Sequence, residues 1–171
     1  MHQKWLLLFT TLFSLSLFSE TPPSSALKVT CSAFTDGGMI PQKYTCNGRN
    51  VNPPLVVENV PEGAKTLVLI VDDPDAANGT WNHWLVWNMD RKTSKIEEDS
   101  VPSNAVQGAN DFKKTQYGGP CPPSGTHRYF FRVYALDVVL ELAGGSGRSS
   151  LDDSMKGHIL SQGELMGKYS R

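Results

Sequence analysis

The sequence predicts a mostly β protein, a β-sandwich with one helix near its C-terminus. About six or seven short apolar segments are separated by turn sequences rich in glycine, proline, asparagine and aspartate. These segments do not alternate regularly with helical patterns, which argues against a doubly wound parallel sheet. A chain of 171 residues has the length of one domain with a sizeable core.

The expected strands are short. In chain order they are residues 27–34, 55–57, 67–71, 84–88 and 129–136, and residues 137–142 either extend the last strand or form a further one. The segment 67–71 is continuously apolar, which is typical of a strand that is buried on both faces. Residues 90–116 are mostly polar and are expected to form a long surface excursion.

One helix is expected after the glycine-rich segment 143–147. It begins near Ser150, a residue type that caps helix N-termini, and ends near Gly163. The helix dipole favours the two aspartates that follow the cap, in the first turn. Apolar residues four apart form one buried stripe, made of Leu151, Met155 and Ile159.

The N-terminal residues 1–26 predict a secretory signal peptide. A short positive flank precedes the largely apolar residues 5–18, which are too few to span a bilayer comfortably. Small residues follow, so cleavage is expected after Ser19 or after Ala26. The remaining residues, 27–171, then form one domain that is periplasmic or secreted. An uncleaved membrane anchor is the alternative.

The charge composition gives no sign of nucleic-acid binding. Lysine and arginine number 16, and aspartate and glutamate number 17, so the formal net charge is −1. Proteins that bind the phosphate backbone carry a basic surplus, which this chain lacks.

Three cysteines, Cys31, Cys46 and Cys121, allow three disulfide pairings. In an exported protein two of them are expected to pair. Cys46 and Cys121 are favoured, because both lie in proline- and glycine-rich loops that would flank one site. Three unpaired thiols are the alternative. The spacing fits no zinc finger, and we expect no cofactor.

Polar residues directly follow the buried strand 67–71. Three carboxylates, Asp72, Asp73 and Asp75, lie within four residues and repel one another unless a cation, a histidine or N–H donors lie nearby. His83 and His127 are the natural partners. Three interpretations remain open: a polar pocket in which imidazole and phenol groups hold an anion, a metal site, or structural groups that cap strand ends.

Three motifs resemble the phosphatidylethanolamine-binding protein family, in particular its bacterial branch of Raf-kinase-inhibitor-like proteins. They are Asp-Asp-Pro-Asp-Ala at 72–76, Trp-Asn-His-Trp at 81–84 and Gly-Gly-Pro-Cys-Pro-Pro-Ser-Gly-Thr-His-Arg-Tyr at 118–129. The resemblance covers roughly residues 29–169. The cysteine in the last motif makes this loop differ in length from that of the eukaryotic members.

The resemblance implies a Greek-key β-sandwich with a small pocket for phosphate or a phospholipid head group. Carried over motif by motif, the ligand-binding residues are Asp73, Asp75, His83, Gly119, Pro120, His127 and Tyr129, with Pro122 or Pro123 at the rim. Regulation of kinases or of flowering, known among eukaryotic members, is not carried over to an exported protein.

We therefore expect an exported protein that binds a small anion and is not an enzyme. A lipid at a membrane surface is a conceivable source of the head group, and a homodimer stays open. The protein partner, if there is one, is not identified by the sequence. The alternatives are an inhibitor of a protein partner, of kinase- or protease-inhibitor type, and a weak metal-assisted hydrolase that uses the same pocket.

Overall fold

A computed structural model describes residues 26–171 of the chain. The predicted signal peptide lies outside the described residues, apart from Ala26. Within the described range, no helix has the length and apolar character needed to cross a membrane.

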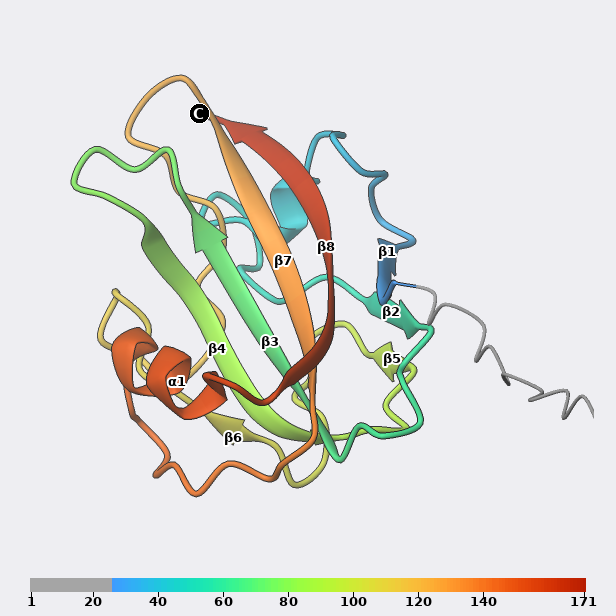
Figure 1. Cartoon of the computed structure of the whole chain (residues 1–171). Helices are drawn as coiled ribbons and strands as arrows, with labels where there is room; N and C mark the ends of the chain where they lie inside the picture. Colours follow the sequence, from blue (N-terminus) through green and yellow to red (C-terminus); the bar gives the residue numbers. More distant parts are fainter. Residues whose placement is uncertain (1–25) are drawn as a thin grey trace, which may run out of the picture.

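Within residues 26–171, eight strands form two antiparallel sheets, and one α-helix covers the larger sheet (Figure 1). The five-stranded sheet has the order β6 (Val106–Gln107), β4 (Trp81–Asp90), β3 (Thr66–Asp73), β7 (Thr126–Leu136) and β8 (Ile159–Ser170). The three-stranded sheet has the order β1 (Lys28–Cys31), β2 (Leu55–Glu58) and β5 (Lys95–Ile96). The helices are α1 (Arg148–Met155) and a 3-10 turn, η1 (Gln42–Tyr44). The predicted mostly β, sandwich-like fold is confirmed.

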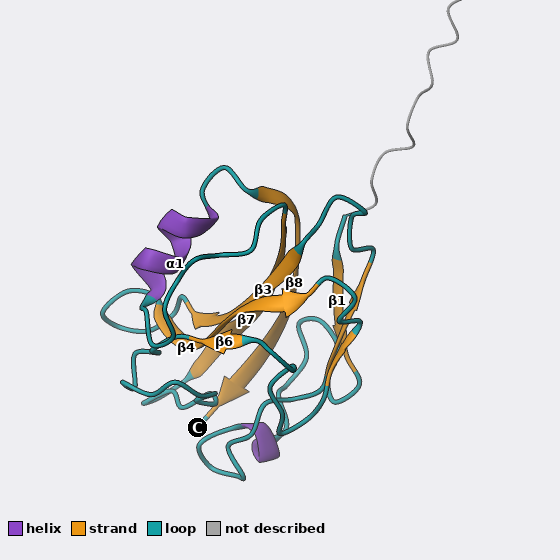
Figure 2. Cartoon of the chain, turned by 90° about the horizontal axis from the view of Figure 1, so that it is seen from below, coloured by secondary structure: helices purple, strands orange, loops and turns teal. Residues whose placement is uncertain are grey.

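The molecule has three layers with a core between each pair. Figure 2 shows α1 on one side of the large sheet and β1 on the other. The larger core lies between the two sheets and includes Leu55, Leu69 and Phe131. The smaller core lies between the large sheet and α1, where Leu151 and Met155 pack onto Trp87 and its neighbours.

Strand β3 contributes to both cores, which explains its continuous apolar sequence. Successive side chains of a strand point to opposite faces. Leu67, Leu69 and Val71 enter the core between the sheets, whereas Val68 and Ile70 enter the core under α1. Every residue of β3 is therefore buried, and its two terminal carboxylates are placed on opposite sides of the sheet.

A β-bulge in β4 changes the direction of His83. Val71 pairs with Trp84, but the next residue, Asp72, pairs with Asn82, so His83 is an extra residue without a partner on β3. Simple alternation would place His83 beside Leu85, under α1. The bulge lets His83 face the same side as Trp84, because a bulged strand turns a side chain away from its regular direction.

The prediction for the C-terminal helix is wrong at both ends. The helix begins at Arg148 after an N-cap at Gly147, so Ser150 is an internal residue and the first turn contains no acidic residue. It ends at Met155, and Gly157 follows with φ +82°, a conformation that commonly terminates helices.

The residues after this turn form strand β8, which the sequence analysis missed. Ile159 is exposed rather than part of a buried helical stripe, and Gly163 lies inside the strand. The pairing of β8 with β7 extends from Thr126–Ser170 to Leu136–Ile159. This long-range pairing outweighs the local helical spacing of the apolar residues, as tertiary contacts commonly do.

Smaller differences concern the loops. The first strand covers only Lys28–Cys31 of the expected segment 27–34. Residues 137–142 contain no strand, and the excursion 90–116 contains the two short strands β5 and β6.

Glycine at position 163 is required by the close approach of β8 to the segment before β1. A Cβ atom at Gly163 would lie 2.0 Å from the backbone oxygen of Leu27. Gly163→Ala is expected to lower the free energy of unfolding by about 1–3 kcal/mol, because a backbone segment must shift. Chemical denaturation measures this difference. Gly63→Ala is the control, since its new Cβ would meet only the flexible Leu160 side chain, at 3.5 Å; equal stability of the two variants would contradict this account.

Candidate functional site

Two histidines from different strands line one hollow of about 250 Å³ at the end of the large sheet. We call this the histidine hollow. Its lining residues are Asp73, Ala76, Ala77, Asn78, Trp81, His83, Phe112, Cys121, Pro122, Pro123 and His127. Strand β3 supplies Asp73, β4 supplies Trp81 and His83, and β7 supplies His127.

Each imidazole is held through its Nδ1 atom. His83 Nδ1 lies 2.5 Å from the backbone oxygen of Gly118, and His127 Nδ1 lies 2.7 Å from Asp73 Oδ2. Because a carbonyl oxygen only accepts, Nδ1 of His83 carries the proton. In both rings Nε2 is left as the nitrogen for a ligand.

Burial lowers the pKa of His83, although the Gly118 carbonyl and the charge of Asp73 act in the opposite direction. The side chain is almost completely enclosed, and enclosure disfavours the imidazolium form. Burial therefore outweighs the nearby carboxylates, which by themselves raise the pKa of this histidine. Neutral His83 presents Nε2 as a hydrogen-bond acceptor, whereas protonated His83 presents it as a donor.

Two buried donors at this site have no hydrogen-bond partner among the described residues. They are the Trp81 indole Nε1 and the Tyr129 hydroxyl. The centroid of the Tyr129 ring lies 5.2 Å from that of His83 and 6.5 Å from that of His127. Burial, and then the charge of Asp73, raises the pKa of Tyr129, so its hydroxyl stays protonated. An unpaired buried donor costs about 1–3 kcal/mol, which a bound acceptor would recover.

The loop that follows Tyr117 is fixed from several sides. The Gly118 N–H donates to the backbone oxygen of His83, and the Gly119 N–H donates to Asn50 Oδ1 at 2.7 Å. A Cβ atom at Gly119 would lie 2.3 Å from the Tyr44 backbone oxygen, so only glycine fits. This wall of the hollow is therefore positioned before any ligand arrives.

A disulfide attaches the same loop to the segment after η1. Cys46 and Cys121 are paired, and the Cys46 N–H also donates to the Pro120 backbone oxygen at 3.1 Å. Cys121 lines the histidine hollow, whereas Cys31 is a free, half-buried thiol elsewhere.

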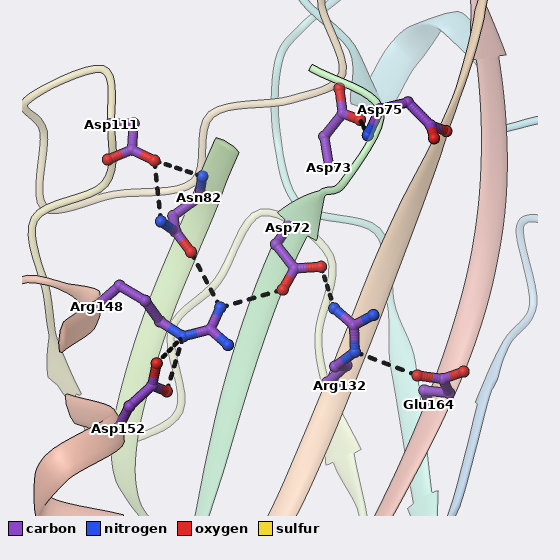
Figure 3. Close-up of polar contacts among 9 residues, drawn as sticks. All are labelled: Asp72, Asp73, Asp75, Asn82, Asp111, Arg132, Arg148, Asp152 and Glu164. Atoms are coloured by element: carbon purple, nitrogen blue, oxygen red, sulfur yellow. Dashed lines mark hydrogen bonds and ion pairs between the residues drawn. The ribbon is translucent and has the colours of Figure 1, made fainter. Parts of the chain in front are cut away.

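The carboxylate of Asp75 is directed away from the histidines. It pairs with Arg128 through Oδ1 at 2.6 Å, and Oδ2 accepts from both the Nε and the backbone N–H of Arg128. Figure 3 shows Asp73 and Asp75 at the end of β3, where Asp73 Oδ1 accepts from the Asp75 N–H. The structure thus gives Asp75 the role of fastening the start of β7 to this turn.

The seven predicted site residues other than Asp75 occupy three kinds of position. Four of them line the histidine hollow: Asp73, His83, Pro122 and His127. Tyr129 packs against both imidazoles. Gly119 and Pro120 form the backbone of the adjoining wall, and Gly119 lines a neighbouring hollow with both disulfide cysteines.

Two aromatic residues at the hollow were not predicted. Trp81 shares a face with Asp73, its partner across β3 and β4, and Phe112 packs edge-on against His83 with ring centroids 5.3 Å apart. Phe112 is 38% exposed. An aromatic residue in the otherwise polar segment 90–116 was the signal that could have identified it.

The metal interpretation finds no ligand set in the described part of the chain. No group of three or more histidine, cysteine, aspartate or glutamate side chains there is arranged to hold a metal ion.

Comparison with known proteins gives one consistent family. The model of the phosphatidylethanolamine-binding protein family matches residues 30–170. A UPF0098 protein of Methanothermobacter thermautotrophicus is 47% identical over 144 residues, which cover 81% of this chain and 95% of that protein.

Two solved structures have the same fold. The crystal structure of CT736, a phosphatidylethanolamine-binding protein homologue of Chlamydia trachomatis, is 44% identical with a TM-score of 0.83, and the match covers 86% of this chain and 99% of CT736. YbcL of E. coli, described as a member of the mammalian family of these proteins, is 29% identical with a TM-score of 0.79, again covering 86% and 99% of the two chains.

The Asp75–Arg128 pair predicts how the stability of the protein changes at acidic pH. Hydrogen bonds from Arg128 lower the pKa of Asp75 from 3.8 to about 2. A carboxylate with a depressed folded-state pKa stabilises the protein above its unfolded-state pKa and loses this contribution as the pH falls. Asp75→Asn is expected to be less stable than wild type near pH 6, and the difference should shrink between pH 4 and pH 2. Urea denaturation across this range tests the prediction, and a difference that does not vary with pH would contradict it.

Proposed function

Because the chain belongs to the phosphatidylethanolamine-binding protein family, we propose that the histidine hollow binds a small anion, either free phosphate or the phosphorylated head group of a phospholipid. The observation that carries the proposal is a pair of buried donors without acceptors: Nε1 of Trp81, which lines the hollow, and the hydroxyl of Tyr129, whose ring packs against His83. A phosphate offers several acceptor oxygens to separate donors at once.

The Asp73 carboxylate lines the hollow, but its hydrogen bonds within the protein make it compatible with a bound anion. Asp73 already accepts from His127 Nδ1 and from the Asp75 N–H. Two N–H groups of the protein thus already occupy its oxygens, and its contact with Nδ1 orients His127 so that Nε2 is the nitrogen left for the ligand. The ammonium group of an ethanolamine head group would find its acceptor in the same carboxylate.

The proposal is binding without catalysis. Cys121 is the cysteine among the lining residues, and its sulfur forms the disulfide with Cys46, so it offers no thiol nucleophile. Both imidazoles are anchored through Nδ1, as suits fixed hydrogen-bonding groups.

We infer that the protein acts outside the cytoplasm, in the periplasm or after secretion. The apolar residues 5–18 and the Cys46–Cys121 disulfide support this inference, since disulfides persist mainly in oxidising compartments.

Tyr129→Phe separates ligand binding from folding. The variant removes a hydroxyl that has no protein partner, so stability should be unchanged or slightly higher. The affinity for orthophosphate and for phosphorylethanolamine should fall by about tenfold, because a hydrogen bond to a charged acceptor is lost. Isothermal titration calorimetry measures the affinity and thermal unfolding measures the stability.

The matched control is Tyr117→Phe. The Tyr117 hydroxyl donates to the Tyr44 backbone oxygen, so its removal should cost about 1 kcal/mol of stability and leave the affinity unchanged. Undiminished phosphate binding by Tyr129→Phe would refute the proposed site.

The pKa of His83 predicts a pH dependence of binding. Burial keeps the free imidazole neutral near pH 7, and an anion at Nε2 favours the imidazolium, so binding should take up a proton and become tighter as the pH falls from 8 to 6. Sulfate is the suitable probe, since its charge is constant over this range.

Calorimetry in buffers with different ionisation enthalpies measures the proton uptake. His83→Gln should abolish the proton uptake by the His83 imidazole that accompanies sulfate binding. Equal uptake by the variant and the wild type would exclude His83 as the proton acceptor.

A further inference from the structure

The face of the large sheet opposite the histidine hollow carries a connected set of polar side chains. Figure 3 shows Arg148 at its centre, reaching from α1 across the ends of β3 and β4. Its Nη1 atom lies 3.1 Å from Asp72 Oδ2 and 3.0 Å from Asn82 Oδ1, and its Nε donates to Asp152 at 2.8 Å. One guanidinium therefore joins the helix to two strands.

The first branch leads from Arg148 to His127. Asp72 is completely buried and is also paired with Arg132 of β7. Its neighbour in β3, Asp73, points to the other face and holds His127 Nδ1 at 2.7 Å. Because the two carboxylates share one stretch of backbone, the ion pairs of Asp72 fix the place from which Asp73 reaches His127.

The second branch leads from Arg148 to His83. Asn82 accepts from Arg148 and donates through its backbone N–H and its Nδ2 to Asp111 Oδ2, at 2.6 and 2.9 Å. Asp111 immediately precedes Phe112, whose ring packs edge-on against both Trp81 and His83. This branch positions the aromatic wall of the hollow from behind.

The chemistry of these contacts requires an arginine. Its planar group presents separate N–H donors at fixed angles, whereas a lysine offers a single ammonium centre. The Arg148 side chain is 28% exposed and borders a hollow of about 430 Å³ with a mostly polar lining, so its replacement opens no cavity in the apolar cores. Asp72 would also keep its ion pair with Arg132, and a variant at position 148 is therefore expected to fold.

We propose that Arg148 is a positioning residue for the histidine hollow, acting on His127 through Asp72 and on His83 through Asn82 and Asp111. This inference deepens the proposed function and rests on it for the effect on ligand affinity. The effect on the two imidazoles is independent of any ligand.

The first measurement uses the ligand-free protein with its full mature chain. Side-chain nitrogen and carbon NMR shifts of the imidazoles are compared in Arg148→Gln, Asp72→Asn and Asp111→Asn. Arg148→Gln should shift both His83 and His127, Asp72→Asn mainly His127, and Asp111→Asn mainly His83. His158, which pairs with Asp137 at the surface, is the internal reference and should not move.

The second measurement is the affinity for orthophosphate. Arg148→Gln should weaken it by at least about fivefold, a usual size for coupling between separate sites. Arg148→Lys keeps the charge but not the geometry, so it should recover only part of the loss. Glu164→Gln is the matched control: it removes the exposed partner of Arg132 and should leave the affinity within about twofold of wild type.

The outcomes distinguish the two proposals. Unshifted imidazole signals in a folded Arg148→Gln variant would overturn the positioning role, as would an equal loss of affinity in Glu164→Gln. If Asp72→Asn does not fold, Arg148→Gln and Asp111→Asn still decide the matter. If the wild type does not bind orthophosphate while the imidazole shifts follow the two branches, the positioning role stands and the proposed ligand is wrong.

Discussion

The burial of strand β3 on both faces is the constraint on which the site depends. One face packs against the small sheet and the other against α1. At the end of this strand, Asp72 and Asp73 continue the alternation and enter the borders of different cores. A buried carboxylate is tolerated only with partners, so Asp72 takes two arginines and Asp73 takes His127. The orientation of His127 thus follows from how the central strand is packed.

Much of the fold could be predicted from local patterns, because the apolar residues of most strands by themselves indicate a buried strand. The continuous apolar segment 67–71 and the largely apolar segment 129–136 are both strands. Strand β8 could not be predicted in this way. Residues 159–170 contain two glycines, and Ile159 continues the four-residue spacing of Leu151 and Met155. What makes this segment a strand is its pairing with β7, and pairing depends on residues more than twenty positions away.

The site could be predicted as a set of residues, but not as a set of bonds. The resemblance implied that Asp75 is a ligand-binding residue. In the structure its carboxylate pairs with Arg128, and nothing in the motif identifies Arg128 as its partner. The direction of His83 depends on a bulge, which arises from a mismatch between two paired strands and has no signature in one of them. Trp81 and Phe112 are recognisable as site residues only when the strand and the polar segment are seen together.

The proposed role of the histidine hollow in binding would oppose the stability of the fold. A ligand of a few atoms gains too little from binding to organise its own walls, so affinity requires that the walls be fixed beforehand. Gly118 is held by His83, Gly119 by Asn50 and Cys121 by the disulfide. Near these fixed walls, the Tyr129 hydroxyl and the Trp81 indole N–H are buried without acceptors. The folded protein therefore retains two unsatisfied donors, and the buried cores on either side of β3 supply the stability that offsets them.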